Sequence, residues 1–191
     1  MIVDTLVDVK SNIANSRDFK ISDNSTHLFR MLSDFLYSNK EMCVLHELCA
    51  NGVDEHKRFG IPETPIEIIA PTALEPKLTI RDFGEGLTED MVYHLLTTYG
   101  ESGEHKRKSN EFFGAWGIGS KSVAAVTKTW EVKSYHHGTA SFYVVFINER
   151  GIPTITKTHS EPTDKSGLEI IIPIAKDNHY KWTNLFSDVF K

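Results

Sequence analysis

The sequence predicts an α+β fold, in which helices cover one face of a mixed, mostly antiparallel sheet to make a two-layer sandwich. Helical periodicity comes first, before residue 60, and most later apolar segments have the composition or alternation of strands. The pattern of helices first and neighbouring strands afterwards is typical of α+β rather than doubly wound α/β proteins. The length of 191 residues fits one compact domain, so residues 1–191 are predicted to form a single unit.

The first third of the chain predicts an arm and two helices. Residues 1–20 are polar and weakly patterned, and we interpret them as an arm with room for one strand. Apolar residues at helical spacing then predict one helix over 24–38 and another over 40–58. Gly60 and Pro62 are expected to end the second helix. Its core-facing residues are predicted to be Leu45, Leu48, Cys49 and Val53.

The remainder predicts mostly strands. They are expected at 65–70, 77–81, 130–137, 139–147, 155–160 and 167–174. His137-Gly138 is typical of a hairpin turn between two of them. Helices are predicted over 88–98 and 181–191, and the charged, glycine-containing segment 99–113 predicts a mobile loop.

Composition narrows the classes of protein. A formal net charge of -5 argues against a nucleic-acid surface, so no nucleic acid is predicted as a partner. Two cysteines without a Cys-x-x-Cys spacing favour a reducing cytosol over a disulfide framework. No apolar run approaches the roughly 20 residues that cross a bilayer. The scattered histidines, including His136 and His137, are interpreted as background rather than as a metal site.

Glu47, Asn51 and Asp54 share one face of the second predicted helix, at spacings i, i+4 and i+7. Mg²⁺ prefers such oxygen ligands, and Asn51 offers one without extra negative charge beside a polyphosphate. Glu47 is placed to polarise an attacking water as a general base. The alternative is that this polar stripe faces solvent, as polar helix faces usually do. His46-Glu47 begins the zinc-protease pattern, but Ala50 stands where its second histidine belongs.

A second group of residues, Asp82-Phe83-Gly84-Glu85-Gly86, follows a predicted strand. An aspartate held between a strand and flexible glycines can accept a hydrogen bond from an exocyclic amine such as that of adenine. The same pattern is also an ordinary turn. The Asp-Phe-Gly within it does not indicate a protein kinase, because the His-Arg-Asp loop is missing.

A third group is a glycine-rich loop that runs into a predicted helix, where backbone N–H groups can approach phosphate oxygens. Its candidate phosphate contacts are Gly114, Gly117, Gly119, Ser120 and Lys121. The loop does not match the Walker A pattern, because Ser120 adds one residue, and a Rossmann pattern would need glycine at Ser122. A tight loop packed on a sheet remains the structural alternative.

The ordered set of three motifs resembles the Bergerat-fold ATP site of the GHKL superfamily, which includes DNA gyrase, the ninety-kilodalton heat-shock chaperone, histidine kinases and mismatch-repair ATPases. The motifs are Glu-x3-Asn-x2-Asp-Glu at 47–55, Asp-x-Gly-x-Gly at 82–86 and Gly-x2-Gly-x-Gly at 114–119. The resemblance implies ATP and Mg²⁺ as cofactors and residues 97–113 as the lid over the nucleotide. A histidine kinase or a topoisomerase subunit would need further domains for which 191 residues leave no room.

Carried over by resemblance, each motif residue receives a role. Glu47 is similar to the catalytic base, Asn51 to the magnesium ligand, and Asp54 to an aspartate that supports the pocket. Asp82 is similar to the adenine acceptor, with Gly84 and Gly86 shaping the adenine wall. The phosphate loop is implied at Gly114, Gly117 and Gly119.

Two positions depart from this resemblance. The segment Ser166–Ile170 falls where the superfamily has a fourth motif, usually Gly-Thr, but this chain has Leu168 in place of the threonine. Lys121 has no equivalent, and it either meets a phosphate as a point charge or lies on the helix surface.

End to end, the chain is similar to the amino-terminal domain of the phage rIIA protein family. The stretches YSNKEMCVLHELCANGVDEH, LTIRDFGEGL, FFGAWGIGSKS, EVKSYHHG and KSGLEIIIP carry that resemblance. Members are described as longer, membrane-associated proteins that control lysis timing and protect against prophage-induced early lysis. The resemblance implies an unidentified host or phage protein as partner, a nucleotide-dependent homodimer, and the host bacterial cytoplasm, with peripheral association at the inner membrane face.

The leading hypothesis is a nucleotide-dependent switch or slow ATPase, in which ATP and Mg²⁺ order the lid and the amino-terminal arm. Gyrase-like and chaperone-like ATPases complete their site with a residue from a following domain, so binding without efficient hydrolysis is expected here. The alternative is a nucleotide-independent interaction protein that mimics or inhibits a host GHKL protein, which Leu168 favours.

Overall fold

The computed structural model describes residues 39–97, 119–149 and 153–189. The predicted arm (1–20), the predicted helix over 24–38 and nearly all of the predicted lid (97–113) lie outside these ranges, as do Gly114 and Gly117.

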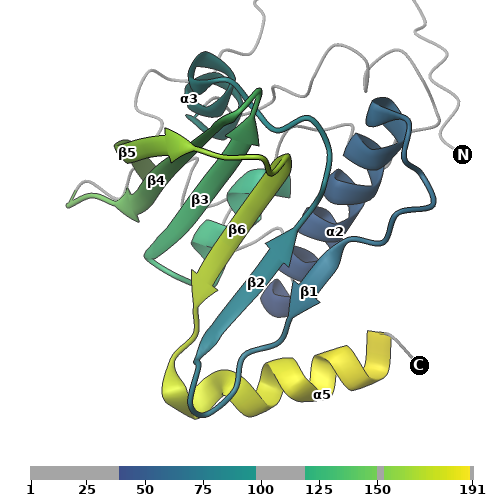
Figure 1. Ribbon diagram of the computed structural model, residues 1–191. Coiled ribbons are helices and arrows are strands. Elements are labelled where there is room, and N and C mark those ends of the chain that lie inside the picture. The colour runs from purple at the N-terminus through teal and green to yellow at the C-terminus, as the bar shows by residue number, and fades with distance from the viewer. Residues whose placement is uncertain (1–38, 98–118, 150–152, 190–191) are drawn as a thin grey trace, which may run out of the picture.

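The described chain forms a six-stranded sheet with the strand order β1-β2-β6-β3-β4-β5 (Figure 1). Every pairing among the described strands is antiparallel, and the α+β two-layer prediction is confirmed. The strands are β1 (Glu67–Ile69), β2 (Lys77–Arg81), β3 (Thr129–His136), β4 (Thr139–Ile147), β5 (Pro153–Pro162) and β6 (Gly167–Pro173). The last strand in sequence is therefore central, and it joins the β1-β2 pair to the β3-β4-β5 meander.

The helices are α2 (Lys40–Phe59), α3 (Glu89–Thr97) and α5 (His179–Val189), with short 3₁₀ helices η1 (Gly119–Ala125) and η2 (Lys176–Asn178). Figure 1 shows α2 running behind β1 and β2, with α5 across the ends of β2 and β6. Asn39 caps α2 by accepting a hydrogen bond from the Met42 N–H at 3.0 Å. Gly60 ends it with a φ of 83°, as the sequence predicted. Within the described residues, no helix is long and apolar enough to cross a membrane.

One hydrophobic core lies between the inner face of the sheet and the helices. Apolar side chains of α2, η1 and α5 meet those of four strands there, and the principal ones are Val44, Leu45, Leu48, Leu78, Ile80, Val123, Val132, Tyr143, Ile170, Ile172 and Trp182. The expectation for Val53 is wrong, because this side chain is 36% exposed. Gly52 takes the buried position instead, and a rotation of about 100° per residue carries Val53 outward.

The predicted strands that fall within the described residues agree with the structure except near their ends. β2 has the predicted bounds, and β4 matches 139–147. β1 is shorter than predicted, and β5 is longer because β4 pairs with it along its whole length. The hairpin is confirmed: His137 and Gly138 have φ values of 44° and 81°, the two positive values that a type I′ turn requires.

Candidate functional site

Asp82 lies immediately after β2, where the chain turns away from the sheet and toward α2. Its residue is 8% exposed, and its Oδ1 accepts hydrogen bonds from the Gly84 N–H at 2.9 Å and the Leu168 N–H at 3.2 Å. Its own N–H donates to the Leu168 carbonyl at 2.9 Å. The aspartate is therefore held by its own loop on one side and by the start of β6 on the other.

The loop 82–86 passes so close to two other backbones that only glycine fits at the contacts. Gly167 has a φ of 104°, and a Cβ there would overlap the Asp82 carbonyl. Gly86 has a φ of 76°, and a Cβ there would overlap the Tyr135 carbonyl. Gly86 was predicted to shape this wall, whereas the role of Gly167 was missed. Glycine adopts positive φ at the least cost, and the two close approaches leave no room for a Cβ, so the geometry requires glycine at both positions.

The helix α2 meets this loop through Gly52 and Glu55. The backbones of Gly52 and Asp82 are close together, because a Cβ added to Gly52 would lie 3.4 Å from the Cβ of Asp82. Gly84 packs against the side chain of Glu55, and the Glu85 N–H donates to Glu55 Oε1 at 3.4 Å. The first and second sequence motifs are therefore neighbours in the structure.

The polar stripe of α2 does not simply face solvent. Asp54 is 1% exposed, while Glu47 and Asn51 are partly buried. Asn51 directly precedes Gly52, the residue that approaches Asp82. The solvent-facing alternative is thus wrong for Asp54. The proposed magnesium ligand and general base lie on the same helix, at the next turns toward its amino terminus.

His56 is a residue that the sequence analysis missed. It is 1% exposed; its Nδ1–H donates to the Thr64 carbonyl at 2.8 Å and its Nε2 accepts from the Phe83 N–H at 2.7 Å. A carbonyl can only accept and an N–H can only donate, so these partners select the neutral Nδ1–H tautomer. The ring ties the end of α2 to the loop beside Asp82. The sequence signal that could have identified His56 is its place directly after Asp54-Glu55, the end of the first motif.

Charged residues on the outer side of the loop form a second set of contacts. Arg58 bridges Glu55 and Glu85, with 2.8 Å between its Nη2 and Glu85 Oε2. His137 Nε2 lies 3.2 Å from Glu85 Oε1. The Arg58 hydrogen bond, followed by that of His137, lowers the pKa of the Glu85 carboxyl. Glu85 is therefore a carboxylate at neutral pH and links α2 to the β3-β4 hairpin.

The third motif is described only at its end. Gly119, Ser120 and Lys121 begin η1, a 3₁₀ helix in the place where the loop was predicted to run into a helix, and the side chains of Ser120 and Lys121 are outside the described part. The fourth motif does join the site. Leu168 binds Asp82 through its backbone and turns its side chain against the core, while Ser166 Oγ donates to the Phe83 carbonyl at 3.3 Å.

Burial raises the pKa of Asp82 to about 6, although hydrogen bonds from Gly84 and Leu168 oppose the shift. The folded-state pKa is above the unfolded value of about 4, so the folded protein binds the extra proton more tightly. The contribution of the Asp82 carboxyl to the free energy of unfolding is therefore fully present below about pH 4 and is lost as pH rises through about 6. For Asp82→Asn, which keeps the Oδ1 acceptor, we expect this loss to disappear.

Urea unfolding of wild type and Asp82→Asn between about pH 4 and pH 7 measures this effect. As pH rises across that range, the free energy of unfolding of the wild type should fall relative to that of the variant by on the order of 2 kcal/mol. This follows from a shift of about two pKa units. Parallel stability curves for the two proteins would contradict it. Asp82→Asn is then expected to be folded at neutral pH, so its response to ATP–Mg²⁺ can be compared with that of the wild type.

Comparison with known proteins gives a distant similarity. No family model matches the chain. "Chaperone protein HtpG" of Alcanivorax borkumensis is 26% identical over 174 residues, covering 80% of this chain and 28% of the relative. "Chaperone protein HtpG" of Buchnera aphidicola subsp. Cinara cedri is 26% identical over 178 residues, covering 75% and 28%. The chain thus spans little more than a quarter of the length of these relatives. Because the GHKL resemblance of the sequence includes a chaperone class, this weak similarity loosely supports a GHKL ATP-binding domain.

Proposed function

We propose that the chain binds ATP with Mg²⁺ in the manner of a GHKL domain and acts as a nucleotide-dependent switch or slow ATPase. The observation that carries this proposal is the buried Asp82 carboxylate. Both side-chain hydrogen bonds described for it end on Oδ1, so Oδ2 is the oxygen we assign to the exocyclic amine of adenine. A charged acceptor held by two backbone N–H groups is orientated before any ligand arrives.

The surroundings of Asp82 fit a flat, mostly apolar base. Gly84, Gly86 and Gly167 pack closely on Glu55, the Tyr135 carbonyl and the Asp82 carbonyl, so the loop that carries the aspartate is held in one shape. Leu168 adds a partly buried apolar side chain beside it. Base pockets combine apolar walls with a few placed polar groups, and this arrangement matches that description.

The phosphate end of the proposal rests on α2. Bound Mg²⁺ would neutralise charge on the polyphosphate, and Asn51 is the residue we assign to hold it. Glu47 lies one helical turn away and would polarise the attacking water, while the buried Asp54 supports the helix at this point. Gly114, Gly117, Gly119, Ser120 and Lys121 are the proposed phosphate contacts.

At the level of the whole protein, we propose a phage rIIA-like role in which the ATP-bound form modulates a host or phage partner during infection. Ordering of the lid by the γ-phosphate would supply the change in surface, and a nucleotide-dependent homodimer is one form that this could take. The host bacterial cytoplasm, with peripheral association at the inner membrane face, is the location that this role requires.

One observation favours a second function. The side chain of Leu168 packs against the core at the position where the superfamily usually has a threonine hydroxyl near the base. A protein that no longer uses nucleotide, and that serves as an interaction protein mimicking or inhibiting a host GHKL protein, would tolerate this exchange.

The test is thermal unfolding of the full chain with and without excess ATP–Mg²⁺. Ligand at about one hundred times its Kd stabilises the folded state by roughly 2.7 kcal/mol, which is a measurable rise in Tm. We expect this rise in the wild type and its loss in Asp82→Asn, because an asparagine cannot present two charged acceptor oxygens. Asp164→Asn, an exposed position in the loop before β6, is the matched control and should keep the full rise.

The outcomes separate the two functions. A rise in Tm that is lost only in Asp82→Asn supports nucleotide binding at this loop. A rise that is equal in all three proteins places the nucleotide elsewhere and contradicts the assignment of Asp82. If no protein is stabilised, the interaction protein becomes the better explanation.

A further inference from the structure

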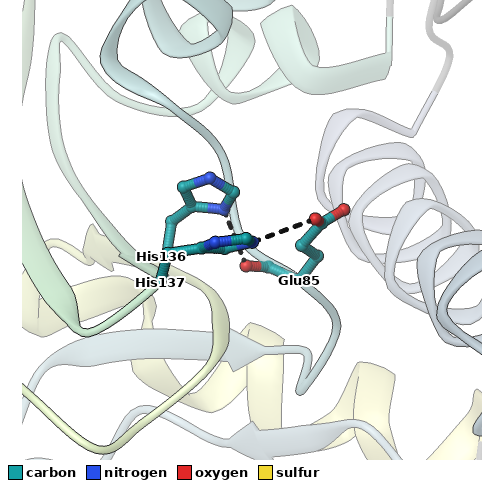
Figure 2. Close-up of side chains that lie close together, drawn as sticks. All are labelled: Glu85, His136 and His137. Carbon is teal, nitrogen blue, oxygen red and sulfur yellow. Dashed lines mark hydrogen bonds and ion pairs between the residues drawn. The ribbon is translucent and has the colours of Figure 1, made fainter.

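Glu85, His136 and His137 bring three metal-ligand side chains together at the outer edge of the loop 82–86 (Figure 2). One ring nitrogen of each histidine and a carboxylate oxygen of Glu85 lie within 4.8 Å of one another. The interpretation of these histidines as background does not account for this arrangement. We propose that the three residues form a site for a divalent transition-metal ion such as Zn²⁺.

The turn of the β3-β4 hairpin is what places both histidines on one side. Neighbouring residues of a strand ordinarily point to opposite faces. The φ of 44° at His137 turns its ring back, so the two imidazoles lie 4.1 Å apart, centroid to centroid, with an angle of 32° between them. Asn or Asp is the usual residue before glycine in such a turn, so the turn itself does not require a histidine.

The distances already approach those of a metal site. Zn²⁺ binds imidazole nitrogen and carboxylate oxygen at about 2.0 to 2.2 Å, so ligand atoms in a tetrahedral site are about 3.3 Å apart. His137 Nε2 and Glu85 Oε1 are 3.2 Å apart. His136 is held nearby through a 3.1 Å contact between its Nδ1 and the Glu85 carbonyl, and a rotation of its ring would complete the set. A water would fill the fourth position.

Charge and orientation also favour a cation here. Arg58 binds the other oxygen of Glu85, Oε2, and therefore fixes the carboxylate while Oε1 faces the histidines. Arg58 also contacts Glu55, so two carboxylates face one guanidinium and a negative charge remains. The His137 side chain is 71% exposed, which lets an ion enter from solvent. Two imidazoles and one carboxylate select Zn²⁺, Co²⁺, Ni²⁺ or Cu²⁺ over Mg²⁺ or Ca²⁺.

A metal in this position would tie the β3-β4 hairpin to the loop that holds Asp82. Glu85 is three residues from Asp82 and lies between Gly84 and Gly86. Metal binding would thus stiffen the edge of the candidate nucleotide site without using any of its assigned ligand contacts. The proposal does not depend on nucleotide binding, and it is tested without nucleotide.

The experiment is titration of the metal-stripped full chain with Co²⁺, followed by visible absorption, and with Zn²⁺ in competition with a chromophoric chelator. His137→Asn is the main variant, because asparagine tolerates the left-handed backbone of the turn. His136→Gln and Glu85→Gln test the other two ligands. His159→Gln is the matched control, since that ring stacks on Phe142 from β5 and is not one of the three proposed ligands.

We expect one equivalent of tightly bound metal in the wild type and in His159→Gln. Each of the three ligand variants should bind Zn²⁺ about tenfold more weakly or worse, with a native circular dichroism spectrum. Absence of a one-to-one complex in the wild type overturns the proposal. Affinities that do not change in His137→Asn and Glu85→Gln overturn it as well, because the metal would then be bound by other residues.

Discussion

Replacing Gly167 with alanine is expected to remove most of the stability of the domain. The new Cβ would overlap the carbonyl of Asp82 and would also approach the backbone of Phe83. Neither is the end of a flexible side chain, so relief requires the start of β6 to move away from the loop. The φ of 104° adds strain for any residue with a Cβ. Together we expect a loss of about 4 kcal/mol or more, against a typical total of roughly 5 to 15 kcal/mol.

Two other glycines make this prediction specific. Gly60 has a φ of 83°, but a Cβ added there would meet no atom within 4 Å, so Gly60→Ala should cost only about 1 kcal/mol. At Gly84 the obstacle is the Cγ of the Glu55 side chain rather than backbone, so Gly84→Ala should fall between the two. Urea unfolding of the series measures the order. If Gly167→Ala unfolds within about 1 kcal/mol of Gly60→Ala, the close approach of the two backbones is not limiting.

The elements that could be predicted from sequence are those with a local signal. The helix α2 has apolar periodicity and a glycine stop, and β2 to β4 have alternation and a hairpin turn. The order of the strands in the sheet has no such local signal in the sequence. That β6 inserts between β2 and β3 depends on pairings far apart in the chain, such as Ile80 with Ile170. Alternation shows only that a strand has a buried face.

In the candidate site, too, the residues of a local motif could be predicted from sequence and the contacts from distant elements could not. Asp82, Gly84 and Gly86 were predicted because they lie in one short motif. The contacts that hold this motif come from three other elements: His56 of α2, Ser134 of β3 and Leu168 of β6. Ser134 Oγ, for example, accepts from the Leu87 N–H and donates to its carbonyl, both at 2.7 Å. A serine in a strand gives no sign of such a partner, because its partner is fixed only by the fold.

His56→Ala is the second change for which we expect a large effect. It removes the partner of the Thr64 carbonyl and of the Phe83 N–H in a region where the ring is 1% exposed. Thr64 is exposed and its carbonyl can bond to water, so the cost comes mainly from the partly buried Phe83 N–H, at about 1 to 3 kcal/mol, and from the empty volume of the ring. We expect a loss of about 3 kcal/mol or more in the free energy of unfolding, measured by urea denaturation at neutral pH.

The matched control is His46→Ala, an exposed histidine on the same helix, which should change stability by no more than about 0.5 kcal/mol. A second readout follows from the position of the ring. Because Phe83 directly follows Asp82, loss of the hydrogen bond between His56 and the Phe83 N–H should also weaken the rise in Tm that ATP–Mg²⁺ causes in the folded variant. If His56→Ala were as mild as His46→Ala, the other contacts of the loop, among them those of Glu55, Ser166 and Leu168, would be sufficient to hold it. The His56 ring would then not be needed to keep the shape of the motif.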